Sequence, residues 1–352
     1  MLLLFQEGIP DIFFPALVSR GCTIARFATD PAQAHKNLAE YPGAKAIFFR
    51  ANFALGKAEL DLLPELSLAA LVSTGSDNVD SAAVQARGLK FVSGEGANAQ
   101  AVFDYVMQAL LYGGFDPGRH SVGVIGVGHV GSRVLAFLKN SGVKTEHFDP
   151  FKQDTGSRDA AVACDFVTFH VPLTHAGEHA TAGMLTEEYF ASAGAKTHII
   201  QASRGGIWNK EFYASLADNP NIEILAQDVY PVEPPPVSAL RRAKFSTPHI
   251  AGYSTRGRLG GIRKGIRALF PDFLGDDLMP QGRAWLLREE AATFAANPGA
   301  FSALRDGYGW RKEFHEYTQA ERAAFCSLFQ GVPGLFFDKL FDKTNHLAPR
   351  NV

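Results

Sequence analysis

Three polar residues, each just past a short apolar run, have side chains suited to acid–base and carboxylate chemistry. Arg204 lies in QASRGG, Glu233 in DVYPVEP and His249 in TPHIAG. A guanidinium can hold a carboxylate with two parallel hydrogen bonds, and an imidazole can exchange a proton near neutral pH. A carboxylate beside that imidazole would raise its pKa and fix its orientation. We therefore expect these three residues to form one catalytic set.

A glycine-rich turn lies upstream of the three residues. Residues 126–131 read GVGHVG, after an apolar run and before a helical pattern. In a dinucleotide-binding fold, Gly126 permits the tight turn, Gly128 lets the backbone approach the pyrophosphate, and Gly131 lets the helix and strand pack closely. The N–H groups at the start of the helix favour phosphates, so we expect His129 and Val130 to bind the cofactor as well.

An acidic residue follows at the distance expected for ribose recognition. Asp149 comes 18 residues after Gly131 and directly follows a predicted strand. Its carboxylate could accept hydrogen bonds from the adenosine ribose and would repel a 2′-phosphate, which favours NAD over NADP. A dinucleotide site followed by an Arg, a Glu and a His suggests hydride transfer between NAD(H) and a 2-hydroxy or 2-oxo acid.

The chain resembles the D-2-hydroxyacid dehydrogenase family over roughly residues 1–280, and within it the subfamily of erythronate-4-phosphate dehydrogenases. The family's Arg-Gly, Glu-Pro and Pro-His-Ile-Ala-Gly motifs occur here in the same order. The resemblance implies that Arg204 grips the substrate carboxylate and polarises its carbonyl. It implies that His249 exchanges the hydroxyl proton and that Glu233 pairs with His249. It also places Pro172, in HVPL, and Asp228 at the cofactor.

The same resemblance indicates where the acid would bind. Ser73, Thr74 and Gly75 match a turn whose backbone N–H groups hold the substrate. Arg50 matches an Arg that reaches the substrate in the subfamily, and Tyr253 matches a residue of its substrate site. These matches favour a phosphorylated substrate such as 4-phospho-erythronate, in pyridoxal phosphate biosynthesis.

Two alternatives stay open at this point. Ala51 stands where the subfamily typically has Ser, which favours another 2-hydroxy acid: glycerate, 3-phosphoglycerate or a simple 2-oxo acid. The second alternative is not an enzyme but a binding protein that senses NAD(H) on the same fold. The retained Arg204, Glu233 and His249 favour an enzyme.

Strand and helix patterns alternate along most of the chain, which predicts an α/β fold with doubly wound parallel sheets. We expect a flavodoxin-like substrate domain at 1–97, a Rossmann NAD-binding domain at 98–257, and a return to the substrate domain at 258–284 by analogy with the family. The composition changes from about residue 285, so 285–352 is expected to be a C-terminal dimerisation segment, as the resemblance implies. Strands are expected at 1–5, 46–49, 69–72, 90–92, 122–125, 145–148, 166–171, 198–202, 222–226 and 244–246.

Composition excludes several classes of function. The 352 residues carry a formal net charge of −2, which gives no general field for nucleic acid or an anionic membrane. The three widely spaced cysteines form neither a metal motif nor a disulfide framework. We expect no metal, no transmembrane segment and no signal peptide. The expected protein is a cytoplasmic homodimer that acts on a small 2-hydroxy acid.

Overall fold

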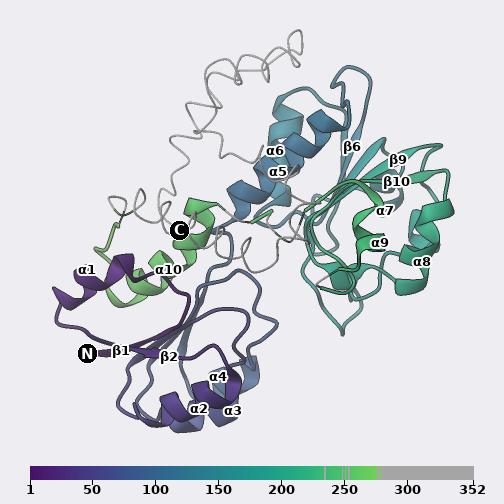
Figure 1. Cartoon of the computed structure of the whole chain (residues 1–352). Helices are drawn as coiled ribbons and strands as arrows, with labels where there is room; N and C mark the ends of the chain where they lie inside the picture. Colours follow the sequence, from purple (N-terminus) through teal and green to yellow (C-terminus); the bar gives the residue numbers. More distant parts are fainter. Residues whose placement is uncertain (234, 248, 250, 253, 276–277, 279–352) are drawn as a thin grey trace. The chain divides into compact units, whose positions relative to one another are not determined.

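The computed structural model describes residues 1–233, 235–247, 249, 251–252, 254–275 and 278. These residues form two units, each with its own parallel sheet (Figure 1). Unit 1 comprises Met1–Asn98 and the described residues after Gly252, and unit 2 comprises Ala99–Gly252. Unit 1 therefore resumes in the chain after Gly252. The N–H of Gly257 donates to the Ser254 hydroxyl at 3.0 Å, so the helix that begins unit 1's second part is capped within that unit.

Unit 1 is built on five parallel strands in the order β2-β1-β3-β4-β5. Four of them are short, largely apolar runs that the sequence pattern had predicted. The pattern did not predict β2, because Thr23 and Arg26 interrupt its apolar residues at the edge of the sheet. The strands are β1 (Leu2–Gln6), β2 (Thr23–Phe27), β3 (Ala46–Phe49), β4 (Leu68–Leu71) and β5 (Lys90–Ser93).

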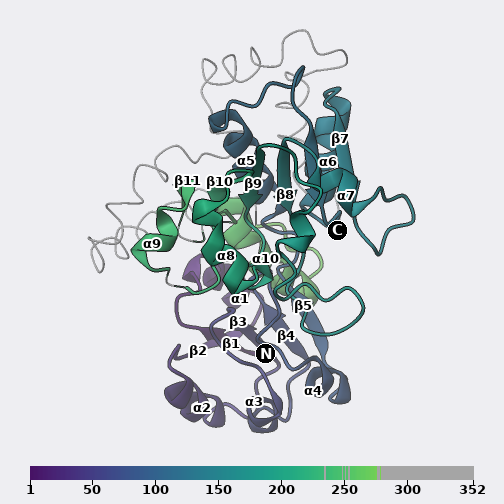
Figure 2. The same cartoon turned by 90° about the vertical axis from the view of Figure 1, so that its right-hand side faces the viewer.

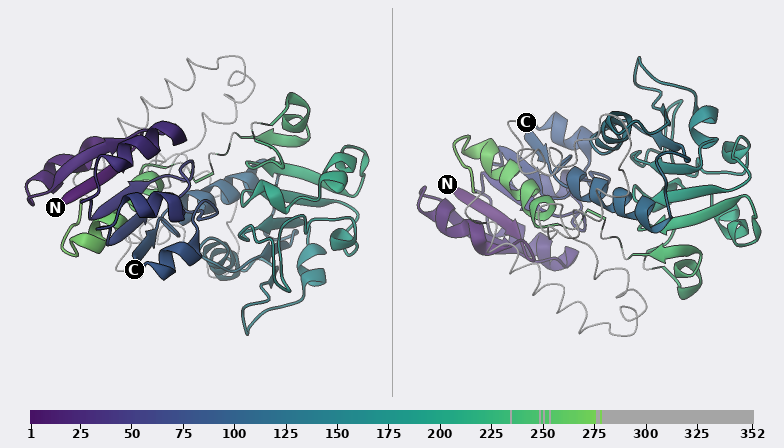
Figure 3. Two further views of the ribbon diagram at one scale, coloured as in Figure 1. Left: turned by 90° about the horizontal axis from the view of Figure 1, so that it is seen from below. Right: turned by 90° about the horizontal axis from the view of Figure 1, so that it is seen from above.

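Helices cover both faces of this sheet. One face packs on α1 and α10 and buries residues such as Phe48 and Ile262, whereas the other packs on α2, α3 and α4 around Leu38 and Phe49. Figure 3 shows α10, in light green, against the purple and blue N-terminal part of the chain. The helices are α1 (Phe14–Val18), α2 (Pro31–Ala39), α3 (Lys57–Leu62), α4 (Ser81–Ala86) and α10 (Thr255–Leu269), with a 3-10 turn, η1, at Asp11–Phe13.

Unit 2 is built on six parallel strands in the order β11-β10-β9-β8-β6-β7. Figure 2 shows β11, β10, β9 and β8 side by side in this order. The strand order reverses between β6 and β8, and ligands of such sheets bind outside the carboxyl ends of the strands at that point. The strands are β6 (Val122–Ile125), β7 (Thr145–Phe148), β8 (Phe166–Phe169), β9 (Thr197–Gln201), β10 (Ile222–Gln227) and β11 (Ala243–Ser246).

Two apolar cores lie on the two faces of the unit 2 sheet. One contains α5 and α6, whose Phe103 and Phe137 rings meet edge to face at 5.4 Å, and the other contains Phe169, Trp208 and Phe212. The doubly wound α/β prediction is confirmed for both sheets. The helices are α5 (Ala99–Tyr112), α6 (Gly131–Asn140), α7 (Arg158–Val162), α8 (Lys210–Ser215) and α9 (Val237–Leu240), with 3-10 turns η2 (Glu188–Phe190), η3 (Gly205–Ile207) and η4 (Leu216–Asp218).

No helix in the described part of the chain has the length and apolar character needed to cross a membrane. The expected dimerisation segment, 285–352, lies outside the described residues.

Candidate active site

The glycine-rich turn joins β6 to α6, at the point where the strand order reverses. Gly126 has φ +85°, and a Cβ there would lie 2.7 Å from the His170 carbonyl oxygen. A Cβ on Gly131 would lie 1.9 Å from the carbonyl oxygen of Gly126, so only glycine allows this close approach of helix and turn. A Cβ on Gly128 would meet no atom within 4 Å. The space beside Gly128 is therefore open on the protein side, which fits the approach of a pyrophosphate.

Asp149 follows β7 and contacts the same turn. Its Oδ2 accepts a hydrogen bond from the N–H of Val127 at 2.8 Å, and its Oδ1 accepts one from the N–H of Phe151 at 3.0 Å. The carboxylate is thus fixed beside the glycine-rich turn, where the sequence predicts an acidic residue that binds the adenosine ribose. His129 and Val130 lie in the same turn, and Val130 is the N-cap residue of α6.

Arg204 begins the turn after β9. A Cβ on the next residue, Gly205, would lie 1.7 Å from the Tyr230 carbonyl oxygen, so the Arg-Gly pair lets this turn press against the segment after β10. The Nη1 of Arg204 donates to the Ser203 carbonyl at 2.9 Å. The Nε2 of Gln201, which ends β9 and is fully buried, donates to the Arg204 carbonyl at 3.2 Å. The backbone that carries the guanidinium is thereby fixed.

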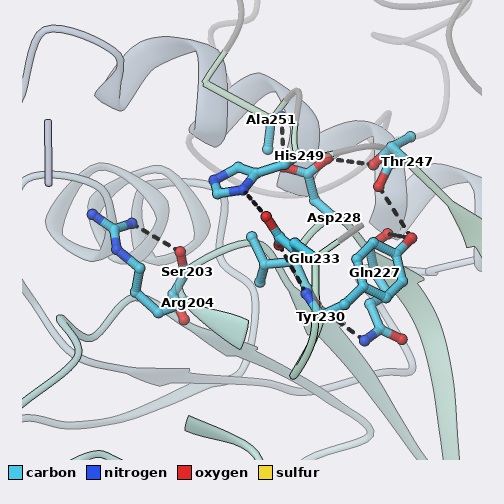
Figure 4. A network of polar contacts seen from close by, with 10 residues as sticks. Ser203, Arg204, Gln227, Asp228, Tyr230, Glu233, Thr247, His249 and Ala251 are labelled. Atoms are coloured by element: carbon cyan, nitrogen blue, oxygen red, sulfur yellow. Dashed lines mark hydrogen bonds and ion pairs between the residues drawn. The ribbon is translucent and has the colours of Figure 1, made fainter. Parts of the chain in front are cut away.

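Glu233 and His249 form a close pair (Figure 4). The Nδ1 of His249 lies 2.7 Å from the Oε2 of Glu233, and the Oε1 of Glu233 accepts the N–H of Tyr230 at 3.1 Å. A carboxylate only accepts, so this network assigns the proton to Nδ1 and leaves Nε2 for a substrate. The His249 side chain is 52% exposed, so a substrate can reach it. In the view of Figure 4 the imidazole is drawn between Glu233 and Arg204.

The contact between Glu233 and His249 changes the pKa of both side chains. Hydrogen bonding to Glu233 raises the pKa of His249 above its ordinary value, against the opposing effect of burial. Burial favours the neutral form of Glu233, but the hydrogen bond and charge of His249, with the more distant Arg204, hold the pKa of its carboxyl below the ordinary value. The negative charge of Asp228 raises the pKa of His249, and the positive charge of Arg204 lowers it.

The loop that carries His249 is held by Asp228, directly after β10. Asp228 is 1% exposed; its Oδ1 accepts the Thr247 hydroxyl at 2.6 Å and its Oδ2 accepts the N–H of Ala251 at 2.7 Å. Its carbonyl accepts the N–H of His249 at 2.9 Å. His249 has φ +58°, a conformation that costs energy for residues other than glycine. Bonds on either side of His249 therefore hold a strained backbone in place.

Further buried polar side chains support this loop, and sequence reasoning missed their role. The Tyr230 hydroxyl donates to the carbonyls of Gln227 and Thr247, each at 3.1 Å. The Tyr105 and Thr247 hydroxyls are 2.9 Å apart. A signal was present: Gln201 and Gln227 each follow apolar residues at the carboxyl end of a strand, and both are fully buried. Sequence reasoning assigned Asp228 to the cofactor, and that contact stays a prediction.

Pro172 lies in the loop after β8, which contacts the Arg204 turn. The Pro172 carbonyl accepts the Thr181 hydroxyl at 2.6 Å, and a Cβ on Gly206 would lie 3.0 Å from the Leu173 side chain. The structure therefore brings together, within unit 2, the predicted residues of the turn after β6, Asp149, Pro172, Arg204, Asp228, Glu233 and His249.

The other predicted substrate residues belong to unit 1. Arg50 follows β3, and Ser73, Thr74 and Gly75 follow the neighbouring strand β4. The Thr74 hydroxyl accepts the Asn98 amide at 3.4 Å, whereas the buried Ser73 hydroxyl has no hydrogen-bond partner among the described residues. Tyr253 lies outside the described residues.

Within the described residues, no group of three or more His, Cys, Asp or Glu side chains could hold a metal ion.

Comparisons with known proteins show what this chain is similar to. Residues 100–251 match the family model for the NAD binding domain of D-isomer specific 2-hydroxyacid dehydrogenases. An erythronate-4-phosphate dehydrogenase of Azotobacter vinelandii is 32% identical over 289 residues, covering 74% of each chain. One from Tolumonas auensis is 31% identical over 229 residues, covering 62% of this chain and 61% of that protein.

Among solved structures, the NAD⁺-bound 3-phosphoglycerate dehydrogenase of Entamoeba histolytica has a TM-score of 0.61. It is 17% identical, and the match covers 77% of this chain and 96% of that chain. At this identity the likeness concerns the fold alone.

Proposed function

The chain belongs to the family of D-isomer specific 2-hydroxyacid dehydrogenases, and from that premise we propose that it transfers a hydride between NAD(H) and a 2-hydroxy acid. The single observation that carries this proposal is the His249–Glu233 pair at 2.7 Å on a loop held by Asp228, beside Arg204. This arrangement provides a proton acceptor, its orienting carboxylate and a cation for the substrate's carboxylate.

The cofactor fits the residues that would hold it. The open space beside Gly128, the N–H groups at the start of α6 and the Asp149 carboxylate match a pyrophosphate and a ribose without a 2′-phosphate. When bound, NAD⁺ accepts the hydride that leaves C2 of the hydroxy acid, and NADH returns it in the reverse reaction.

The chain's own residues move the proton. In oxidation, the substrate hydroxyl donates its proton to Nε2 of His249, the C2–H bond breaks with its electron pair, and a C=O bond forms at C2. Arg204 holds the carboxylate and polarises the C2 oxygen. Glu233 holds the imidazole through Nδ1 and stabilises the imidazolium that forms. In reduction, the imidazolium returns the proton to the C2 oxygen.

A phosphorylated acid is the substrate class that we favour. The relatives from Azotobacter vinelandii and Tolumonas auensis are named erythronate-4-phosphate dehydrogenases, which supports 4-phospho-erythronate. Ala51 supports the alternative of another 2-hydroxy acid.

A panel of 2-oxo acids with and without a phosphate, followed by the absorbance of NADH, tests the function. We expect turnover with at least one acid and a preference for phosphorylated ones. His249→Asn should lower kcat by about a hundredfold or more, because Asn tolerates a positive φ and removes only the proton carrier. Tight NADH binding without turnover of any acid would instead indicate an NAD(H) sensor.

We also propose a cytoplasmic homodimer that uses residues 285–352. The resemblance to the subfamily supports the dimer, and the free, buried thiols of Cys22 and Cys164 agree with a reducing compartment. Chain truncation before residue 285 should give monomers by light scattering. A dimer that survives the truncation contradicts the assembly.

A further inference from the structure

Thr247, the second residue before His249, has a bonding partner for each of its polar atoms. Its N–H donates to the Gln227 carbonyl at 2.9 Å, and its own carbonyl lies 3.1 Å from the Tyr230 hydroxyl. Its hydroxyl lies 2.6 Å from the Oδ1 of Asp228. Thr247 is 1% exposed, so bulk water does not compete for these bonds. The residue is therefore a fixed anchor at the start of the loop that carries His249.

The carboxylate of Asp228 holds both ends of that loop (Figure 4). Its Oδ1 bonds Thr247 at the start of the loop, and its Oδ2 accepts the N–H of Ala251 at the end. The backbone carbonyl of Asp228 accepts the N–H of His249 between them. Three bonds to one residue thus enclose the positive φ of His249. A movement of this carboxylate would release the strained backbone at His249.

The direction of the bonds at the Thr247 hydroxyl can be assigned. A carboxylate only accepts, so Thr247 donates its single hydroxyl proton to Asp228. The Tyr105 hydroxyl lies 2.9 Å from the same Thr247 oxygen. Because the Thr247 proton is already used, Tyr105 must be the donor in this second bond. The protons therefore point from Tyr105 through Thr247 to the Asp228 carboxylate.

Tyr105 belongs to a segment far from the catalytic residues in the sequence. It lies in the middle of α5, it is fully buried, and it is 142 residues from Thr247. Hydrogen bonds in a chain strengthen one another where water is excluded. A phenol that donates to Thr247 therefore makes the Thr247 hydroxyl a better donor to Asp228. The bond at the Oδ1 of Asp228 thus depends on a helix that packs on one face of the unit 2 sheet.

We propose that Tyr105 is a positioning residue of the active site. It acts on His249 through Thr247 and the Asp228 carboxylate. Its hydroxyl keeps that carboxylate in the place where both ends of the His249 loop bind it. Loss of the hydroxyl should loosen the loop, and with it the 2.7 Å contact between the Nδ1 of His249 and the Oε2 of Glu233. The part of this inference that concerns turnover rests on the proposed function.

The pKa of His249 tests this role without reference to turnover. Hydrogen bonding to Glu233 raises that pKa and burial lowers it, whereas the charges of Asp228 and Arg204 have smaller, opposite effects. Tyr105→Phe keeps the ring and removes only the hydroxyl, so the pKa of His249 should fall toward its ordinary value of 6.5. Long-range ¹H–¹⁵N NMR of the imidazole measures this pKa in the full-length protein, and His249→Asn identifies the signal.

A double-mutant cycle separates positioning through Thr247 from a merely structural role. Thr247→Val keeps the shape of the side chain but removes the hydroxyl through which Tyr105 acts. It should lower the pKa of His249 at least as much as Tyr105→Phe does. Adding Tyr105→Phe to Thr247→Val should then change that pKa no further. An unchanged pKa in Tyr105→Phe, or an equal further fall in the Thr247→Val background, overturns the proposal.

Tyr189→Phe is the matched control, because it removes a phenol from the other apolar core of unit 2. The Tyr189 ring packs on Phe169 and Phe190 in that core. This variant should keep the wild-type pKa of His249 and the wild-type kcat. An equal fall in that pKa in Tyr189→Phe and Tyr105→Phe would show a general loosening of unit 2, which also overturns the proposal.

The kinetic arm distinguishes this inference from the proposed function. With a 2-oxo acid that the wild type reduces, Tyr105→Phe should lower kcat about fivefold, the scale of one neutral hydrogen bond, and change KM less. In the Thr247→Val background the same substitution should leave kcat unchanged. A wild-type kcat in Tyr105→Phe overturns the inference and leaves the proposed function standing. A wild type that reduces no 2-oxo acid, with a pKa of His249 that still falls in Tyr105→Phe, refutes the proposed function and leaves the positioning role standing.

Discussion

The Nδ1 of His249 lies 2.7 Å from the Oε2 of Glu233, although the two residues follow different strands. The second oxygen of the carboxylate accepts the N–H of Tyr230, so the carboxylate is held on both sides. The Nε2 of the imidazole is the nitrogen left for proton exchange with a substrate.

Replacing Glu233 by Gln should shift the pH dependence of catalysis. The hydrogen bond from Glu233 raises the pKa of His249, so a neutral Gln at position 233 should lower that pKa. Reduction needs the imidazolium, so its rate falls as pH rises through the pKa of His249. Oxidation needs the neutral ring, so its rate rises over the same range. The pH profiles of kcat/KM for both directions should therefore move to lower pH in Glu233→Gln. Unchanged profiles would show that Glu233 does not tune His249.

The same pair should stabilise the fold in a limited pH window. The pKa of His249 is raised, so its contribution is complete below the ordinary value of 6.5 and is lost as pH rises through the raised value. The pKa of Glu233 is lowered, so its contribution is complete above 4.5 and is lost as pH falls through the lowered value. The Tm difference between wild type and Glu233→Gln should be largest between these ordinary values. Both side chains are partly exposed, so the difference should be small.

Asp228 is expected to control the position of His249. Asp228→Ala leaves the buried N–H of Ala251 without its acceptor, which should cost about 1–3 kcal/mol of unfolding free energy. The positive φ of His249 should then relax, and kcat should fall. Asp228→Asn keeps an oxygen for Ala251, and the Thr247 hydroxyl can turn to accept, so its effects should be smaller. If Asp228→Ala and Asp228→Asn lower the unfolding free energy and kcat equally, the assigned role of Asp228 is wrong.

Two glycines of the turn after β6 should respond differently to the same substitution. Gly131→Ala places a Cβ 1.9 Å from a carbonyl oxygen and should destabilise unit 2. Gly128→Ala meets no protein atom within 4 Å, so the Tm without cofactor should stay near that of the wild type. NADH titration should nevertheless show weaker binding to Gly128→Ala. Wild-type affinity in this variant would show that the pyrophosphate does not approach Gly128.

The Asp149 carboxylate should select NADH over NADPH. Its charge repels a 2′-phosphate, so the wild type should bind NADH much more tightly. Asp149→Asn should reduce the difference in affinity between NADH and NADPH. It should also keep one acceptor for the N–H of Val127. Fluorescence titration with both cofactors measures the preference, and equal wild-type affinities would refute this role.

The sequence by itself determined what local patterns encode. Strands β3, β6 and β7 have the predicted bounds, because each is a short extended run bordered by turn residues or helical patterns. The glycine-rich turn and the order of Arg204, Glu233 and His249 were also visible, because each depends on residue type within a few positions. Strand β2 was not predicted, because the polar residues Thr23 and Arg26 interrupt its apolar run at the edge of the sheet.

Only the tertiary structure decided how the polar groups pair. Asp228 and Ala251 are 23 residues apart, and Gln6 reaches Asn52 across 46 residues. No local periodicity specifies such bonds, because burial removes water and forces each donor and acceptor to find a partner from another segment. The same long-range bonds hold His249 at a positive φ that its own sequence does not favour.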